Sequence, residues 1–185
     1  LHAETDFISP VIDLRRRSIM AIENVINNDV TNEHTRYGSA KTRYLSKIIT
    51  LNEGQDAEDI RVAITAYRPI DTDIHCYVKL RNGTDPDNFY DKYWTKLDMI
   101  EGNSVYSSSV NSNDMREFVY GLPTTEQLQG TAYTNSLNDG IVQYRNSNGT
   151  IFIGYKSYAI KLVPTAVSSN RVPRISDIRA VNLQI

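Results

Sequence analysis

The sequence has few of the residues that cross-link or interrupt a chain. Among its 185 residues are one cysteine, Cys76, six prolines and nine glycines. A single cysteine excludes an intrachain disulfide and a cysteine-based zinc site, and with them a disulfide-stapled secreted scaffold. The composition also fits neither collagen nor a coiled coil. Cys76 is therefore expected to be a small core residue.

A strong charge of one sign and long apolar runs are also missing. Twenty Lys and Arg residues stand against 22 Asp and Glu, which gives a formal charge of −2. Domains dedicated to nucleic acid are usually strongly basic, so no nucleic-acid partner is expected. No apolar run approaches the ~20 residues that cross a bilayer, and no signal peptide is recognisable. Because the chain begins with Leu1 rather than Met, we expect a processed product or a module of a larger protein.

Tyrosine dominates the aromatic residues that are present. The chain has twelve Tyr against four Phe and one Trp, which is typical of strands with semi-polar faces. Hydrophobic residues make up 40% of the chain, enough to build a core. The length favours one domain over two, and no internal repeat or linker-like composition interrupts it. A single domain over residues 1–185 is predicted.

Period-two alternation is the clearest pattern in the sequence. Apolar residues alternate with polar ones over residues 60–66 and again over 74–80, as a strand with one buried face requires. Residues 69–73 lie between the two runs and contain turn formers, so a hairpin is predicted. The following residues are expected to be buried on adjacent antiparallel strands: Ile60, Val62, Ile64, Cys76, Val78 and Leu80.

Further strands complete an all-β prediction. They are expected over residues 44–51, 118–120, 141–145, 151–155, 157–163 and 181–185. Asn148-Gly149 predicts a type I′ hairpin turn. Residues 18–27 fit either a helical stripe or a strand, and the surrounding strands favour a strand. Together these signals predict an antiparallel β-sandwich, with interface or functional loops over residues 82–91, 102–114 and 124–138.

Candidate catalytic groups have simpler structural explanations. The only histidines are His2, His34 and His75, and no nucleophile-elbow motif is present. His75 is expected on the outward face of its strand. The acidic pairs Asp71/Asp73 and Asp85/Asp87 could serve glycoside hydrolysis, but all four residues lie in predicted loops, where Asp commonly forms turns. No catalytic residue and no cofactor are predicted.

Three other motifs concern ions and surface modification. Asp85, Asp87, Asn88 and Asp91 offer oxygen ligands without the EF-hand pattern, so a solvated acidic loop is expected, with at most a weakly held calcium and no catalytic metal. Two Asn-Gly-Thr triplets, at residues 82–84 and 148–150, match glycosylation acceptors but are interpreted as turns. The basic run at residues 15–17 could hold phosphate or an acidic protein, although a solvated strand edge is favoured.

The order of several segments resembles a known module. The segments are Phe7–Leu14 (FISPVIDL), Asn24–Asn28 (NVINN), Thr42–Lys47 (TRYLSK), Leu51–Pro69 (LNEGQDAEDIRVAITAYRP), Asp91–Leu97 (DKYWTKL), Tyr158–Leu162 (YAIKL) and Val172–Ala180 (VPRISDIRA). Their succession, over roughly residues 7 to 183, resembles a module in virion structural proteins of contractile-tailed phages, especially those of cyanobacteria. Those proteins belong to the tail, baseplate or fibre-attachment region.

The same layout also resembles galactose-binding-like β-sandwiches. That likeness implies a jelly-roll-like pair of sheets, in a family that often binds glycans and frequently holds a structural calcium. The glycan sites of that family vary too much to be carried over to particular residues here.

The phage resemblance implies a non-enzymatic structural domain located in the virion. Its partners would be other virion structural proteins, including copies of itself. Two alternatives stay open: a carbohydrate-binding module used in host recognition, and a glycan-cleaving enzyme. The preferred contact residues are the loop aromatics Phe89, Tyr90, Tyr93 and Tyr106, because aromatics are enriched at interface centres. Trp94 is expected to close the end of the sandwich instead.

Overall fold

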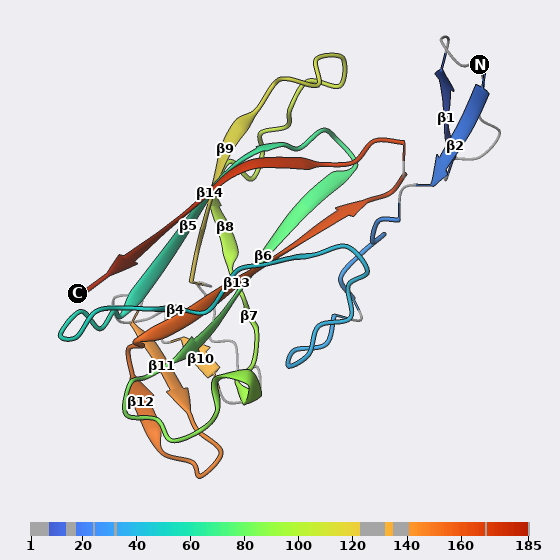
Figure 1. Ribbon diagram of the computed structural model, residues 1–185. Coiled ribbons are helices and arrows are strands. Elements are labelled where there is room, and N and C mark those ends of the chain that lie inside the picture. Colours follow the sequence, from blue (N-terminus) through green and yellow to red (C-terminus); the bar gives the residue numbers. More distant parts are fainter. Residues whose placement is uncertain are drawn as a thin grey trace.

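The fold consists almost entirely of antiparallel strands (Figure 1). The computed structural model describes residues 8–13, 18–23, 25–31, 33–122, 132–134, 141–168 and 170–184. The strands are β1 (Ile8–Asp13), β2 (Ser18–Glu23), β3 (Tyr44–Leu45), β4 (Ile49–Thr50), β5 (Asp59–Tyr67), β6 (Thr72–Arg81), β7 (Thr95–Lys96), β8 (Asp98–Glu101), β9 (Arg116–Gly121), β10 (Ala132–Thr134), β11 (Val142–Arg145), β12 (Ile151–Ile153), β13 (Ser157–Ala166) and β14 (Arg174–Leu183). A 3₁₀ turn, η1, covers Phe89–Asp91. Within the described residues, no helix is long and apolar enough to cross a membrane.

Two sheets pack together and enclose the main core. One sheet has the order β3-β13-β6-β7, with β4 also paired to β13, and the other has the order β14-β5-β9-β8. A smaller sheet, β10-β11-β12, lies near one end, and the β1–β2 hairpin stands apart from the two main sheets in Figure 1. The prediction of an all-β protein with packed antiparallel sheets is confirmed.

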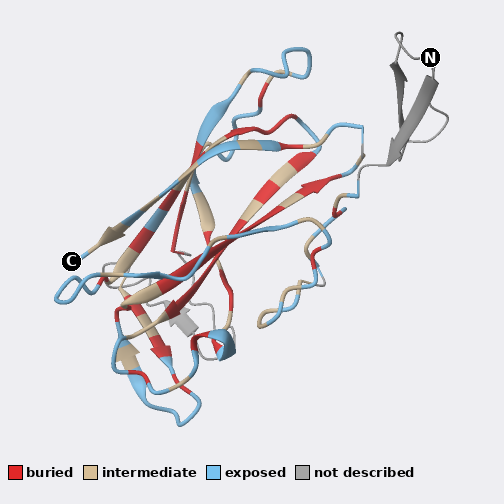
Figure 2. Ribbon diagram, viewed as in Figure 1, coloured by how far each residue is buried: buried red, intermediate tan, exposed pale blue. Residues whose placement is uncertain are grey.

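The alternation in β5 and β6 decides which side chains fill the core (Figure 2). The even-numbered residues of both strands face the partner sheet, and the six core residues predicted from sequence are all buried. Cys76 is completely buried among them. They belong to one cluster, which also includes Leu97, Phe118, Tyr120, Val142, Tyr144, Tyr155, Tyr158, Ile160 and Leu162.

The predicted β5–β6 hairpin is wrong. β5 pairs with β14 and β9, whereas β6 pairs with β13 and β7. Residues 68–71 therefore carry the chain from one sheet to the other, and Ile64 and Cys76 approach the core from opposite sheets. Four residues reach at most about 13 Å, enough for the roughly 10 Å between packed sheets. Alternation identifies a buried face but says nothing about the hydrogen-bonding partner.

The other strand predictions are largely confirmed. β9 lies over the predicted segment, β13 and β14 are longer than expected, and residues 18–23 form a strand rather than a helix. The segment at 44–51 contains two short strands instead of one. Residues 124–131 and 135–138 of the third predicted loop, and the basic run at 15–17, lie outside the described residues.

The β11–β12 hairpin is present, but its turn differs from the predicted type. A type I′ turn needs two positive φ angles, whereas Gly149 alone in this turn has one, at 83°. The Asn146 side chain accepts hydrogen bonds from the backbone N–H groups of Asn148 and Thr150. This side chain supplies acceptors that stabilise the longer loop, so Asn148 does not need the left-handed conformation.

Candidate contact surface beside η1

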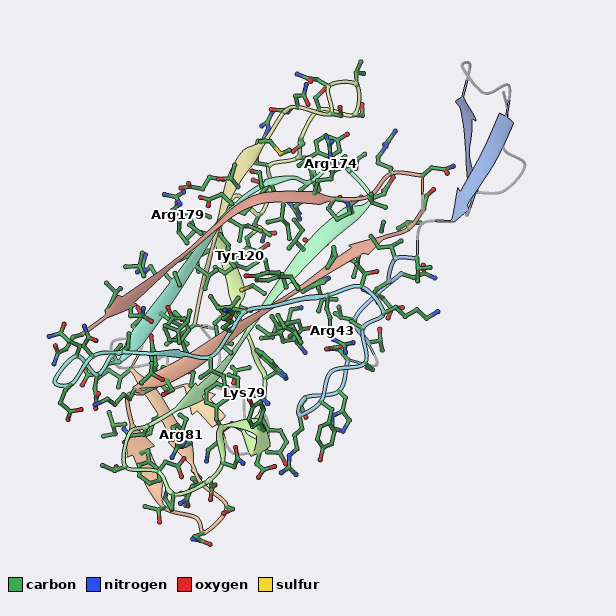
Figure 3. The ribbon with its side chains drawn as sticks, in the orientation of Figure 1. Arg43, Lys79, Arg81, Tyr120, Arg174 and Arg179 are labelled. Atoms are coloured by element: carbon green, nitrogen blue, oxygen red, sulfur yellow. The ribbon has the colours of Figure 1, made fainter. Side chains whose placement is uncertain are left out.

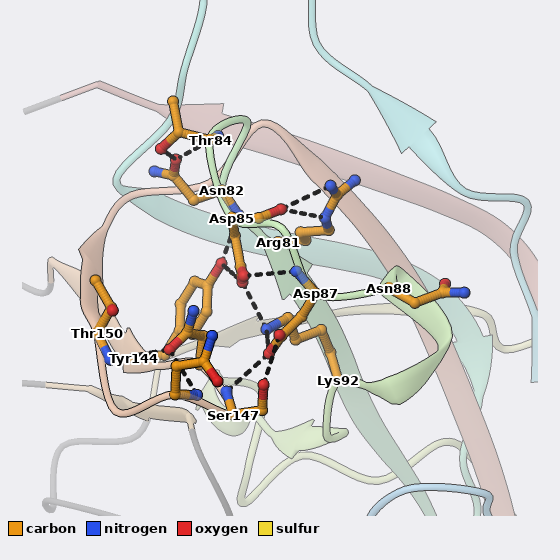
Figure 4. A network of polar contacts seen from close by, with 12 residues as sticks. Arg81, Asn82, Thr84, Asp85, Asp87, Asn88, Lys92, Tyr144, Ser147 and Thr150 are labelled. Carbon is orange, nitrogen blue, oxygen red and sulfur yellow. Dashed lines mark hydrogen bonds and ion pairs between the residues drawn. The ribbon is translucent and has the colours of Figure 1, made fainter.

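A buried ion-pair network fixes the loop that follows β6 (Figure 4). The Lys92 Nζ lies 2.5 Å from the Asp85 carboxylate and 2.8 Å from that of Asp87. The Tyr144 hydroxyl, from β11, donates to Asp85 at 2.6 Å. The Ser147 N–H and hydroxyl both donate to Asp87, at 2.8 and 2.7 Å. The network ties the loop to the β11–β12 hairpin.

The pKa values in the network follow from these contacts. Burial alone would raise the pKa of Asp85, but the hydrogen bonds from Lys92 and Tyr144 outweigh burial and lower it. Hydrogen bonds from Lys92 and Ser147 lower the pKa of Asp87 to about 2. Both carboxylates are therefore held in the charged form that pairs with the ammonium. Burial raises the pKa of Tyr144, which keeps its hydroxyl protonated as a donor.

The expectation of a solvated acidic loop is wrong for Asp85 and Asp87, whereas Asn88 and Asp91 are exposed. Asp85 is only 1% exposed, and an ammonium group already lies against both Asp85 and Asp87. The Lys92 ammonium therefore already supplies a positive charge opposite these two carboxylates. Across the residues that the structure describes, no group of three or more His, Cys, Asp or Glu side chains is arranged to hold a metal ion.

Two buried lysines lie on the outer face of the first sheet, and one of them contacts η1. Lys79 and Lys161 lie on the outer face of the β6–β13 pair, and the Lys79 Nζ donates to the carbonyl oxygen of Tyr90 at 3.0 Å. Both ammonium groups lie over the Trp94 ring, at 5.1 and 5.0 Å from its centroid. Burial lowers the pKa of Lys79 to about 8, and the nearby positive charge of Lys161 adds to this effect. Figure 3 labels Lys79 close to η1.

A segment before β3 covers these lysines. We call residues 25–31 and 33–43 the strap. Its Glu33 forms an ion pair with Lys161, and both side chains are almost fully buried. The Asn27 amide donates to the carbonyl oxygens of Thr42 and Pro164. The strap thus turns the outer face of the β6–β13 pair into a second, smaller core, which contains Ala40, Tyr77, Phe89, Trp94, Ala159 and Val163.

A cleft of about 240 Å³ opens where the strap meets the loop. It is lined by Arg36, Asp87, Asn88, Asp91, Lys92, Tyr93 and Ser147. Arg36 forms an ion pair with Asp91 across the strap–loop contact. Asn88 caps η1 by accepting a hydrogen bond from the Tyr90 N–H. The cleft is therefore a mixed polar and aromatic surface. The Arg36–Asp91 and Lys92–Asp87 ion pairs fix its walls.

The four predicted contact residues do not form a single patch. Tyr90 is 68% exposed beside the cleft, and Tyr93 lines it. Phe89 is only 7% exposed in the second core, so it offers little surface to a partner. Trp94 is buried as expected, but it packs in this second core on the outer face of the β6–β13 pair and does not close the end of the sandwich. Tyr106 lies elsewhere, with the Arg68 guanidinium 4.8 Å from its ring centroid.

A second polar cluster surrounds His75 near the start of β6. Its Nε2 lies 3.9 Å from the Asp73 carboxylate and 3.3 Å from the Thr165 hydroxyl. A nucleophile–histidine–carboxylate relay needs its two partners on different ring nitrogens, so these contacts do not have relay geometry. Burial lowers the pKa of His75. The prediction that Asp73 lies in a loop is wrong, because this residue belongs to β6. Its carboxylate also accepts a hydrogen bond from the Arg68 Nε at 3.0 Å.

The glycosylation-like triplet at residues 82–84 forms a turn. The Asn82 side-chain oxygen accepts from the N–H and hydroxyl of Thr84, and its amide donates to the carbonyl of Ile153 at 2.9 Å. A glycan on this amide would disturb the contact with β12. The interpretation of residues 82–84 as a turn is confirmed.

Comparisons with protein-family models, with curated proteins and with solved structures gave no match for this chain. The geometry described above is therefore the evidence for a site.

Sequence reasoning missed the charged residues of this surface. Lys79 and Lys161 occupy outward positions of alternating strands, which normally predicts solvated side chains. The signal that could have located them is the strap itself, because a polar segment with Glu33 and Arg36 precedes a strand that pairs with β13. Only the fold shows that this segment crosses the outer face and buries both ammonium groups.

Proposed function

We propose that the chain is a non-enzymatic structural module of a phage virion, in the tail, baseplate or fibre-attachment region. It acts by contact with other virion structural proteins, including copies of itself. The jelly-roll-like, galactose-binding-like form of the sandwich is part of the same proposal. The sequence resemblance indicates a phage particle as the location of the chain. The surface beside η1 is the physical argument for contact with other proteins.

The observation that carries the proposal is an exposed aromatic side chain on a rigid loop. Tyr90 is 68% exposed, while Lys79 and Lys92 hold the backbone and acidic residues around it. Interface anchors are commonly large aromatics, and a preordered loop loses little conformational entropy when it binds. Tyr93 adds a second aromatic side chain in the adjoining cleft.

The N-terminal β1–β2 hairpin is consistent with assembly. The β1–β2 hairpin stands apart from the two sheets in Figure 1, and its strands have the sequences ISPVID and SIMAIE. An isolated two-stranded hairpin is marginally stable in water. Contact with a neighbouring subunit would stabilise the hairpin.

A mass-spectrometric census and a particle reconstruction test this function. We expect the chain in purified particles, with Tyr90 and Tyr93 against a neighbouring subunit. The variant Y90A/Y93A should be incorporated less well than the wild-type chain, whereas Val167→Ala, at a side chain that is 78% exposed, should be incorporated normally. Absence of the chain from particles would overturn the proposal.

The cleft specifically favours carbohydrate binding as a second candidate function. Tyr93 lies beside Asp87, Asn88 and Asp91, the combination of an aromatic face with polar groups that binding sites use to orient a ligand. A glycan array with the full chain tests it, with Tyr93→Ala as the loss variant and Val167→Ala as the control. Carbohydrate binding would replace assembly as the proposed role of this surface if two results are obtained. The chain must bind a glycan that Tyr93→Ala no longer binds, and the cleft must face solvent in the particle.

A further inference from the structure

The long outer strand of the second sheet has one unused side. β14 covers ten residues, Arg174–Leu183, and pairs along one side with β5. It is the terminal strand in the order β14-β5-β9-β8, and in the described part of the chain no other strand pairs with it. An edge of this length presents a row of backbone donors and acceptors to another strand.

The register with β5 assigns the faces of β14. Ile178 lies opposite Ile64 and Ile175 opposite Ala66, so both isoleucines point toward the core side. They share a face although they are three residues apart, because the register shifts at an irregularity between Ile175 and Asp177. Asp177 and Arg179 point away from the core, and each side chain is 55% exposed. Within the chain, the Arg179 Nε lies 3.2 Å from the Asp177 carboxylate, and the same guanidinium also pairs with Glu117 of β9. Figure 3 labels Arg179 on the β14 ribbon.

An apolar groove borders the same edge on its inner side. It has a volume of about 300 Å³ and is lined by Tyr44, Leu162, Ile175, Ser176, Asp177 and Ile178. Tyr44 is 47% exposed on β3, the edge of the opposite sheet. The sandwich is therefore open on this side, with partly exposed apolar side chains next to the unpaired strand.

We propose that β14 pairs antiparallel with β14 of a second copy of this chain, about a two-fold axis through Ile178. This pairing places Asp177 of each copy opposite Arg179 of the other, on the same face. Two opposite-charge pairs form across the axis, in addition to the contacts that Arg179 already makes with Asp177 and Glu117 of its own chain. The two Ile178 side chains meet beside the grooves. Cross-strand opposite charges stabilise such a ladder, and like charges destabilise it.

Charge also selects this register over its neighbours. Moving the axis by one residue in either direction places Asp177 opposite itself or Arg179 opposite itself. Among these three positions of the axis, only the one through Ile178 brings opposite charges together. The contact is isologous, so it closes as a dimer rather than growing into a fibre.

The inference deepens the proposed assembly function, on which it rests for the presence of further copies in the particle. It uses a different surface from the cleft beside η1. The two proposals can therefore fail separately: a chain that is monomeric in solution overturns the edge pairing and leaves the particle census unaffected. A chain that forms the dimer but is absent from particles overturns the proposed location and leaves the edge pairing unaffected.

Charge reversal in the full chain provides the test. Sedimentation equilibrium should show a wild-type monomer–dimer equilibrium at concentrations up to about 1 mM. Asp177→Arg places two pairs of like positive charges across the axis, and Arg179→Asp places two negative pairs. Each single variant should dimerise at least about tenfold more weakly than wild type.

Mixing the two variants provides the matched control. In the mixed dimer, both arginines of one copy face both aspartates of the other, so dimerisation should return to about the wild-type level. Circular dichroism and thermal unfolding establish that each variant is folded. A monomeric wild-type chain, single variants that dimerise like wild type, or a mixture that does not recover would each overturn the pairing.

Discussion

At the scale of single residues, burial stabilises the fold when the side chain is apolar and costs free energy when the side chain is charged. The core side chains of β5 and β6 are fully removed from water, so each contributes transfer and packing energy. The buried charges of Lys92, Lys161 and their partners lose hydration that only good geometry restores. Two predictions separate these effects.

Ile64→Ala should destabilise the protein by ~2–5 kcal/mol, because it removes buried methyl groups and leaves a cavity. Ile64 is 0% exposed in the centre of the main core. Urea unfolding measures the loss. Val110→Ala, at a side chain that is 93% exposed, is the control and should change stability by less than about 0.5 kcal/mol. Equal effects of the two variants would contradict the assigned core.

The Asp87 carboxylate should make stability depend on acid pH. Its folded pKa, lowered to about 2, lies below the unfolded value of about 3.9, so its contribution is present above pH 4 and is lost as the pH falls toward 2. The stability difference between wild type and Asp87→Asn should therefore shrink over that interval. Unfolding curves at closely spaced pH values test this, and a difference that stays constant from pH 5 to pH 2 would refute it.

At the scale of elements, turns decide how the strands are connected. Gly149 and Gly154 flank β12 and both have positive φ angles, 83° and 70°. A Cβ at Gly149 would meet nothing within 4 Å, whereas one at Gly154 would lie 2.9 Å from the carbonyl oxygen of Ala57. The two positions share the same backbone requirement but differ in crowding.

Gly149→Ala should cost about 1–2 kcal/mol from the left-handed conformation alone. Gly154→Ala should cost more, because the backbone of residue 57 must also move. Thermal unfolding of the two variants measures the difference. Equal losses would mean that the contact between residues 57 and 154 is not tight, and that conformation alone sets the cost.

At the scale of the whole molecule, the strap joins the N-terminal part of the chain to the first sheet. Its Glu33 lies against Lys161, and burial lowers the pKa of this lysine while the carboxylate opposes that shift. Breaking one side of such a pair leaves an uncompensated buried charge. The strap should therefore be coupled energetically to β13.

Glu33→Met should destabilise the protein by about 3–5 kcal/mol, because Lys161 stays buried without its partner. The double variant E33M/K161M should recover most of that loss, since it replaces both charges with apolar side chains. A double-mutant cycle by urea unfolding measures the coupling. Additive losses would show that the strap is held by its other contacts instead.

Some features of the fold could be predicted from the sequence and others could not, depending on whether local or distant residues determine them. The buried faces of β5 and β6 followed from their alternation, because a strand with one apolar face must bury it. Their pairing did not follow, since a four-residue connection fits a hairpin or a crossing between sheets. The turn at residues 146–150 was located correctly, but the Asn146 side chain set its geometry.

The candidate surface was less predictable than the fold. The loop aromatics were recognised by type. Tyr93 lines the cleft and Tyr90 is exposed beside it, but Phe89 faces the second core. Its orientation depends on η1, a single turn whose direction is set by the Asn88 cap and the contacts around Lys92. Those contacts join residues far apart in the sequence.

The sequence by itself determined the all-β class, the positions of most strands and the apolar residues of the main core, because alternation and turn residues act over a few neighbouring positions. Only the tertiary structure decided which strands pair, where the strap lies, and that Lys79, Asp85 and Lys161 are buried. Pairing and charge burial depend on distant segments that meet after the chain has folded. A local pattern shows that a residue is charged, but not which neighbour will cover it.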